Sequence, residues 1–186
     1  MAKTLAEMSL EELWRLFPVE LAEYDGRHFL RFSRERESLA KLLPAGSRIS
    51  HIGSTAIKNI AAKPITDMLA EVSHGAIFDD VRSALESAGY TCMSVSKGRM
   101  SFNKGYTPTG YEEEVFHLHL RYFGDNDELY FRDYLSEHAD VAAEYAALKK
   151  ELAVRYRYDR DGYTAAKSDF VKKYTERAKR KYGKRY

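Results

Sequence analysis

The order of apolar and polar residues along the chain predicts a mixture of helices and strands in its first two thirds. Strict alternation is typical of half-buried strands, and apolar residues three or four apart are typical of amphipathic helices. We therefore expect strands over residues 48–52, 65–72, 90–95, 99–103 and 114–122, and helices over residues 26–43 and 77–88. Ser9 and Glu12 have the spacing of a capping box and predict a short first helix that ends before Pro18.

From Asn126 onward the pattern is helical to the end of the sequence. The apolar positions recur every three or four residues, at Leu135, Ala139, Ala142, Tyr145, Leu148, Leu152 and Tyr156. Helices with such a stripe bury one face against a sheet or against each other. We expect an α+β fold in one domain over residues 1–186, with N-terminal helices in 1–45, the sheet in 46–125 and C-terminal helices in 126–186.

The composition narrows the class of protein. A chain of 186 residues with 44% hydrophobic content can bury a substantial core. Its single cysteine, Cys92, excludes an internal disulfide framework, and we find no signal peptide or long apolar run, so we expect a cytoplasmic protein without membrane contact. The formal net charge of +2 argues against the broad basic field that nucleic-acid binders use.

The charge is nevertheless uneven along the chain. Residues 172–186 contain eight Lys or Arg and one acid, Glu176, a local charge of +7 that leaves −5 in residues 1–171. A solvated helix end, where the helix dipole favours cations, explains this simply. A helix that docks an acidic partner or RNA is the alternative.

A Gly-Ser pair, Gly53 and Ser54, follows the strand predicted over residues 48–52. Glycine lets the backbone approach a phosphate closely, and the serine hydroxyl adds a hydrogen bond. If residues 55–60 form a short helix, its free N–H groups point at the same anion. An isolated pair of this kind is more often a simple turn, so its weight comes from Asp67, thirteen positions after Ser54.

Asp67 lies within the apolar strand predicted over residues 65–72, where the period of two puts Leu69 and Glu71 on its own face. An unpaired carboxylate between apolar neighbours costs several kcal/mol. Asp67 is therefore expected to face a cation or strong donors, or, as the simpler alternative, to accept hydrogen bonds at a strand end.

The strand predicted over residues 114–122 carries a second polar set. His117, His119 and Arg121 share one face, opposite an apolar face with Phe116, Leu118 and Leu120. Together with Asp67, the two imidazoles would form a set of two His and one carboxylate suited to Mn, Fe or Zn, or they would donate to a phosphate. The alternative is a half-exposed strand with ordinary outward polar residues.

Further cations surround these motifs. His51 and Lys63 flank the central stretch and would help to neutralise a phosphate. Residues 101–111 read as a loop punctuated by Gly and Pro, with Lys97, Arg99 and Lys104 around it. Such a loop either closes over an anionic ligand or carries ordinary solvated charges.

The stretch SHIGSTAIKNIAAKPITDMLAEV, residues 50–72, resembles the signature of the GrpB family, a group of bacterial proteins. Five further segments are similar to the family pattern, so the resemblance covers nearly the whole chain: LEELWRLFPVEL (10–21), SFNKGYTPTGY (101–111), VFHLHLR (115–121), FRDYLSEHADVAAEYAALKKEL (131–152) and DRDGYTAAKSDFV (159–171). Asp133, Tyr163 and Lys167 also recur in that pattern.

The resemblance implies a nucleotidyltransferase-like fold, with a mixed sheet flanked by helices and a helical C-terminal half. Enzymes of that wider class pair the Gly-Ser turn with two carboxylates on a strand, Asp-x-Asp or Asp-x-Glu, which hold a divalent metal on a nucleoside triphosphate. Leu69 occupies the second position here, so the motif is one metal ligand short. A lone carboxylate holds Mg²⁺ weakly until substrate phosphates add their oxygens.

Together these observations lead us to expect metal-dependent nucleotidyl or phosphoryl transfer to an unknown acceptor, with Mg or Mn as cofactor and Zn as an alternative. A non-catalytic module that binds a nucleotide or another phosphorylated small molecule, and an accessory protein that docks through its basic end, are the other hypotheses. We expect Asp67 to be catalytic and to bind metal with His117 and His119. The expected phosphate or nucleotide ligands are His51, Gly53, Ser54, Thr55, Lys63, Lys104 and Arg121.

Overall fold

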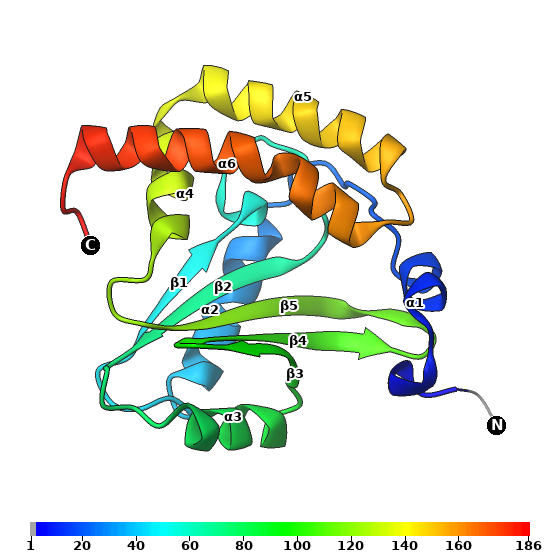
Figure 1. Cartoon of the computed structure of the whole chain (residues 1–186), viewed down its shortest axis with the longest axis vertical. Coiled ribbons are helices and arrows are strands. Elements are labelled where there is room, and N and C mark those ends of the chain that lie inside the picture. Colours follow the sequence, from blue (N-terminus) through cyan, green and yellow to red (C-terminus); the bar gives the residue numbers. More distant parts are fainter. Residues whose placement is uncertain (1–2) are drawn as a thin grey trace.

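A five-stranded mixed sheet organises the molecule, which we describe over residues 3–186 of a computed structural model. The strands lie in the order β1-β2-β5-β4-β3, and only β2 and β5 run parallel to each other. Their bounds are Arg48–Ile52 (β1), Thr66–Val72 (β2), Thr91–Ser96 (β3), Arg99–Thr107 (β4) and Gly110–Tyr122 (β5). The expected mixed sheet and helical C-terminal half are thus confirmed (Figure 1).

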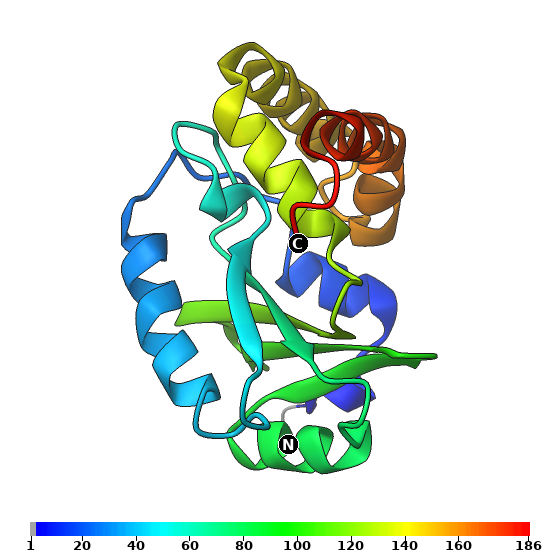
Figure 2. The same ribbon diagram turned by 90° about the vertical axis from the view of Figure 1, so that its left-hand side faces the viewer.

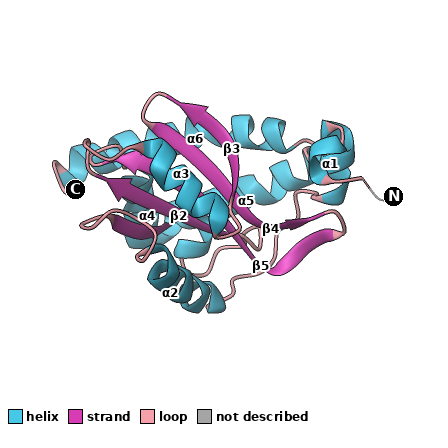
Figure 3. Ribbon diagram, turned by 90° about the horizontal axis from the view of Figure 1, so that it is seen from below, coloured by secondary structure: helices cyan, strands magenta, loops and turns pink. Residues whose placement is uncertain are grey.

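Helices cover both faces of this sheet. Helices α2 (Arg27–Leu39) and α3 (Phe78–Ser87) pack on one face, and Figure 3 shows α3 lying against the strands. The three C-terminal helices gather on the other side and contact one another, as Figures 1 and 2 show: α4 (Asp127–Glu137), α5 (Ala139–Arg155) and α6 (Arg160–Tyr182). The site described below lies on their side of the sheet.

Strand alternation decides which side chains face which layer. Met68, Ala70 and Val72 of β2 join the main apolar core with Leu118 and Leu120 of β5, beneath α2 and α3. The intervening residues of the same strands face the C-terminal helices. One face of the sheet is therefore sealed by apolar packing, and the other is free to carry polar groups.

The N-terminal segment packs on the β4–β5 hairpin through Phe17, which follows two short helices. Helix α1 (Leu10–Leu16) follows η1 (Leu5–Glu7) and is capped by Ser9. The Ser9 side chain accepts from the Glu12 N–H and the Glu12 side chain accepts from the Ser9 N–H, which confirms the predicted capping box. The Phe17 ring that follows packs 4.7 Å from Tyr106 and 4.9 Å from Tyr111, between ring centres.

The prediction of a loop over residues 101–111 is wrong. Strand β4 continues to Thr107 and β5 begins at Gly110, so this segment forms a tight hairpin. Gly105 marks a bulge: its φ is +87°, and a Cβ there would lie 2.3 Å from the Glu114 carbonyl oxygen. Gly105 thus allows the close packing of β4 on β5, and the segment is part of the sheet rather than a loop that closes over a ligand.

Two helix predictions also need correction. Helix α2 ends at Leu39 rather than near residue 43, and the helix expected over residues 55–60 is only a three-residue 3₁₀ turn, η2 (Ser54–Ala56). Within residues 3–186, no helix carries an apolar stretch long enough to cross a membrane.

Candidate functional site

A cleft of about 880 Å³ opens between the polar face of the sheet and helices α5 and α6. Pockets of this size commonly accommodate small-molecule ligands. Seven of the residues expected to form the site line it: Gly53, Ser54, Thr55, Lys63, Asp67, His117 and His119. The chain therefore brings together groups up to 66 positions apart, although the roles expected for them stay predictions.

Strand register explains why the carboxylate and the imidazoles meet. In the parallel pair of β2 and β5, Asp67 lies opposite His117, and Leu69 lies opposite His119. The Nδ1 atom of His117 is 3.2 Å from Oδ1 of Asp67. The polar alternation of β5 thus faces the same side as the one carboxylate at the start of β2.

Gly53 packs directly against Asp67. Its φ is +68°, and a Cβ would lie 2.4 Å from the Asp67 Oδ2 atom, so only glycine fits without displacing the carboxylate. Ser54 follows in η2, which is too short to provide the helix N-terminus that we expected to hold an anion. The Gly-Ser turn therefore offers its hydroxyl and local backbone, without a helix dipole behind them.

A chain of hydrogen bonds runs from Asp67 to helix α6. His117 Nε2 lies 2.7 Å from the Tyr106 hydroxyl, which accepts from Arg160 Nη2 at 3.0 Å. Burial alone would raise the pKa of Asp67. The hydrogen bond from His117 and the positive charges of nearby His and Lys residues outweigh that effect and lower it to about 2. Asp67 is thus a fixed, ionised group at neutral pH.

His119 lies beside Arg121 on the same face. Its Nδ1 atom accepts from Arg121 Nη2 at 3.3 Å. Burial lowers the pKa of His119 to about 4, against the opposing pull of Asp67, so the ring is neutral at pH 7. It offers the cleft a neutral imidazole.

Three lysines and one arginine bring positive charge to the cleft. Lys63, Lys149 and Lys167 line the cleft with Arg160, and within residues 3–186 none of the four makes an ion pair with a carboxylate. Their ammonium groups rest on tyrosine rings, Lys149 at 4.9 Å from the centre of Tyr145 and Lys167 at 4.2 Å from Tyr163.

Burial without a paired carboxylate lowers the pKa of these lysines. Desolvation and mutual repulsion lower the pKa of Lys63 and Lys149 to about 7, and burial lowers that of Lys167 to about 8, although Asp67 opposes the shift in each. Lys149 is 2% exposed, and within the part of the chain that the structure describes its Nζ donates only to the Ala61 carbonyl oxygen. Although Asp67, Asp127, Glu128, Asp161 and Glu176 also line the cleft, these three lysines have no ion-pair partner within residues 3–186, and an anion would stabilise their charged form.

Sequence reasoning missed Lys149, Arg160 and Tyr106. A signal for Lys149 was present, because it lies four residues after Tyr145 and three before Leu152, on the stripe predicted to be buried. A lysine on the apolar face of a helix costs free energy unless it has a task. Lys167 stands in the same relation to Tyr163. Arg160 and Tyr106 gave no such signal, because only the folded chain brings α6 beside β4.

Three expected phosphate ligands lie outside the cleft. His51 pairs with Met68 across the sheet and so faces α2, where its ring stacks on Phe32. Lys104 pairs with Phe116, also on the apolar face, and its Nζ donates to Glu35 at 2.8 Å. Their parity along the strands places both on the wrong side.

Arg121 has the expected parity but a different environment. Its Nη1 donates to the carbonyl oxygens of Met100 and Leu120, and Nη2 lies 3.8 Å from Glu128. The guanidinium thus braces β4 and α4 rather than lining the cleft.

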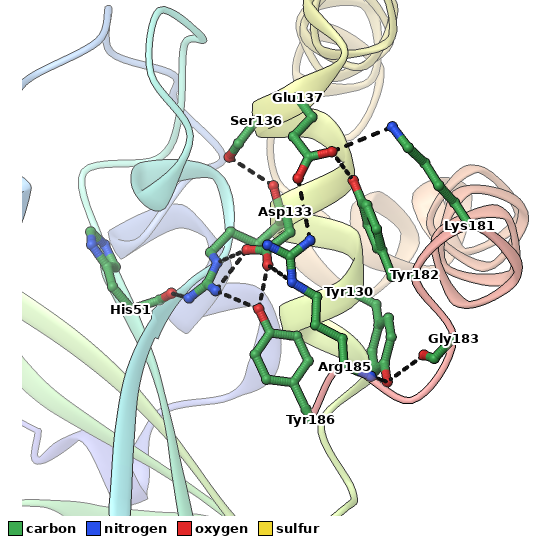
Figure 4. Close-up of polar contacts among 11 residues, drawn as sticks. His51, Tyr130, Asp133, Ser136, Glu137, Lys181, Tyr182, Gly183, Arg185 and Tyr186 are labelled. Atoms are coloured by element: carbon green, nitrogen blue, oxygen red, sulfur yellow. Dashed lines mark hydrogen bonds and ion pairs between the residues drawn. The ribbon is translucent and has the colours of Figure 1, made fainter.

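The basic end of the chain is partly used within the molecule. Figure 4 shows Arg185 and Tyr186 beside Asp133 and Glu137 of α4. Lys181 pairs with Glu137, and Lys179 pairs with Asp127. These contacts lock the last helix onto α4, so a share of the +7 charge is already neutralised.

The same cluster reaches the strand that leads to the Gly-Ser turn. Arg132 of α4 donates to the His51 carbonyl oxygen at 2.9 Å and to the Tyr186 hydroxyl at 3.1 Å. Asp133 accepts from Arg132 and from Tyr186. Asp133 therefore locks helices, while Tyr163 and Lys167 line the cleft.

The donor set does not match a resident metal ion. Among the described residues, no group of three or more His, Cys, Asp or Glu side chains is placed to hold a metal. Asp67 and His117 are close enough to bond to each other, and Leu69 supplies no oxygen where a second carboxylate would stand. The expected set of Asp67, His117 and His119 is thus not assembled as a ligand shell.

The fold is that of a nucleotidyltransferase-like protein. A crystal structure of the Cid1 poly(U) polymerase is similar, with a TM-score of 0.51; the match covers 78% of this chain and 47% of the polymerase chain. The sequences are 12% identical, so this likeness shows the fold alone.

The chain belongs to the GrpB family. The family model described as GrpB protein matches residues 18–177. The crystal structure of the conserved protein GrpB from Enterococcus faecalis is 32% identical, with a TM-score of 0.76, and the match covers 88% of this chain and 99% of that one.

A curated relative, the UPF0157 protein YqkA of Bacillus subtilis, is 35% identical over 184 residues. The match covers 94% of this chain but 52% of that protein, so the chain spans about half the length of this relative.

Proposed function

We propose that the cleft binds the phosphate groups of a nucleotide or of another phosphorylated small molecule. The observation that carries this proposal is the cluster of Lys63, Lys149, Arg160 and Lys167, which are buried or half-buried without a carboxylate partner. A phosphate at this place would replace the missing counter-ions. Its charge-assisted hydrogen bonds would be stronger than bonds between neutral groups.

The Gly-Ser turn would hold the same phosphate from the sheet side. Ser54 lines the cleft next to Gly53, across from the lysines of α5 and α6. Its hydroxyl can donate to a phosphate oxygen. The Tyr145 and Tyr163 rings, which already carry the lysines, give the ligand an aromatic wall.

Thermal unfolding tests this proposal. Sodium tripolyphosphate, ATP, GTP, CTP and UTP are added in turn to the wild-type chain and to the Lys149→Met variant. We expect at least one of them to raise the Tm of the wild type by several degrees, because a ligand that binds only the folded state stabilises it. Lys149→Met should abolish the rise, whereas Lys150→Met, next to it on α5, should keep it. No rise with any of these anions contradicts the proposal.

A second candidate is transfer of a nucleotidyl or phosphoryl group to an unknown acceptor. The position of Asp67 favours it, because the carboxylate lies against the Gly-Ser turn and beside the cationic cluster. Release of pyrophosphate or of a nucleoside diphosphate, measured with each triphosphate and with Mg²⁺, Mn²⁺, Zn²⁺ or EDTA, tests it. Activity that disappears in Asp67→Asn supports transfer, and no product under any of these conditions retires it.

Docking of a partner through the basic end, and a cytoplasmic location, stay predictions. The ion pairs of Lys179, Lys181 and Arg185 with α4 reduce the charge that a partner would meet. Lys184 is exposed and makes no ion pair within residues 3–186. Loss of capture of an acidic partner after charge reversal at Lys184 would support the docking hypothesis, and unchanged capture would contradict it.

A further inference from the structure

We propose that the cleft binds its phosphorylated ligand through lysine side chains and without a divalent metal ion. This inference rests on the proposed function and specifies how the anion is recognised. It departs from the metal site that the sequence led us to expect. The imidazole nitrogens that a metal would need already take part in hydrogen bonds within the protein, and β2 offers the cleft a single carboxylate.

His117 has no lone pair to give. The Asp67 carboxylate can only accept hydrogen bonds, so the His117 Nδ1 atom that faces it must donate, and Nε2 is left to accept from the Tyr106 hydroxyl, whose oxygen accepts from Arg160. We therefore assign the proton of the neutral ring to Nδ1, where it faces the Asp67 carboxylate. If the ring is doubly protonated, both nitrogens are donors. In either state a metal ion would have to break the chain.

His119 is occupied in the opposite sense. Its Nδ1 faces an Arg121 N–H and so must accept, which places the proton of the neutral ring on Nε2. An N–H group cannot ligate a metal, but it can donate to a phosphate oxygen. Both imidazoles thus lack a free lone pair, for two independent reasons.

Of the two acids on this face of β2, only Asp67 lines the cleft. One oxygen of Asp67 faces His117 and the other packs on Gly53. Glu71, the next acid on this face of β2, is 1% exposed and accepts from Asn126 Nδ2 at 2.9 Å and from the Gly124 N–H at 3.3 Å. Mg²⁺ is commonly held by one or two carboxylates together with waters and substrate phosphates, and Leu69 removes the second carboxylate from this face of β2. Of the other acids that line the cleft, Asp127 pairs with Lys179, Glu128 lies 3.8 Å from Arg121, and Asp161 and Glu176 belong to α6.

The lysines supply the charge that a metal would otherwise bring. A terminal phosphate carries about −1.5 to −2 charge at pH 7. Lys63, Lys149, Lys167 and Arg160 together can present up to four positive charges around the same space. Asp67 is then the repulsive neighbour of the anion rather than its bridge to a metal. Removing the Asp67 charge should therefore raise anion affinity if binding is metal-free, and lower it if a metal bridges Asp67 and the anion.

Isothermal titration with sodium tripolyphosphate, in EDTA and separately in MgCl₂ or MnCl₂, tests the inference. We expect wild-type affinity in EDTA to equal or exceed that in either metal. Asp67→Asn keeps the acceptor for His117 but loses the charge, so we expect its affinity in EDTA to stay equal or to rise, by up to about tenfold. Lys149→Met should weaken binding at least tenfold, and the control Lys150→Met should leave it unchanged.

Two different failures are distinguishable. If wild-type tripolyphosphate or ATP binds only with Mg²⁺ or Mn²⁺, and Asp67→Asn loses that binding, the metal-free inference is overturned while the proposed function survives. If neither anion binds with or without metal, both fall. The wild-type comparison needs no variant, so a misfolded mutant cannot obscure it. Nitrogen-15 NMR of the His117 ring gives an independent readout, and a proton on Nε2 with none on Nδ1 would contradict the assignment.

Discussion

The two faces of the sheet come from the same strands but behave in opposite ways. On one face, Met68, Ala70 and Leu118 are wholly buried beneath α2 and α3. On the other, Asp67 and His117 open onto a cleft with unpaired lysines. One-residue alternation thus separates a face that stabilises the fold from a face that carries uncompensated charge.

This difference shows where stability and function are expected to conflict. Removing apolar groups from the sealed face should lower the stability of the fold without a direct effect on ligand binding in the cleft. Removing a lysine charge from the cleft should raise stability and weaken anion binding, since a buried cation without a paired carboxylate destabilises the free protein. Four substitutions or conditions, taken in order of expected size, test that contrast.

The largest effect is expected on the sealed face. Leu118 is fully buried in the main core, so Leu118→Ala should lower the free energy of unfolding by about 2–5 kcal/mol, through lost burial and a residual cavity. Urea denaturation with a constant m value measures it. A loss below about 1 kcal/mol would mean that this face is not the packed core described.

At the junction of the two faces, Gly53→Ala should cost about 2–3 kcal/mol. The positive φ disfavours any Cβ, and the added carbon would displace the Asp67 carboxylate. Gly75→Ala is the matched control, because a Cβ there meets nothing within 4 Å. Equal unfolding free energies for the two variants would refute the close packing of Gly53 on Asp67.

In the cleft, Lys149→Met should stabilise the free protein by about 1 kcal/mol at pH 6–7, because it removes a buried cation that has no counter-ion. The exposed neighbour Lys150 serves as control, and the unfolding free energy of Lys150→Met should lie within about 0.5 kcal/mol of the wild-type value. Destabilisation by Lys149→Met would show that its ammonium group contributes to the fold.

The smallest effect concerns pH. The folded-state pKa of Lys149 is about 7, well below the ordinary value of 10.5, so between these values the unfolded chain binds more protons. The lysine therefore lowers stability most below pH 7, and this penalty fades as pH rises towards 10. The gain from Lys149→Met should shrink over the same range in denaturation curves recorded at several pH values. A constant gain would exclude titration of Lys149 as its cause.

Much of the sheet and half of the site followed from alternation alone. The parity of β5 predicted that His117 and His119 share a face, and the structure places them so. The meeting of Asp67 with them was a separate expectation, and the register of β2 with β5 puts Asp67 opposite His117. The same rule, applied to His51 and Lys104, would have put them on the opposite face. They were chosen for charge and proximity in sequence, which do not determine the side of a strand.

What alternation could not supply was the helical half of the cleft. Lys149 and Arg160 lie more than 80 residues beyond Asp67, and only the packing of α5 and α6 over the sheet brings them near it. The hairpin of β4 and β5 was missed for a local reason, because Gly105 reads as a loop residue although it forms a bulge within a strand. Long-range packing and bulges therefore limited the prediction.

A crystal structure of the protein soaked with sodium tripolyphosphate tests the central claim most directly. We expect phosphate density in the cleft, with oxygen atoms about 3 Å from Ser54 Oγ and from Nζ of Lys149 or Lys167. Anion density found only elsewhere on the molecule, with water alone between these three residues at saturating ligand, would contradict the claim.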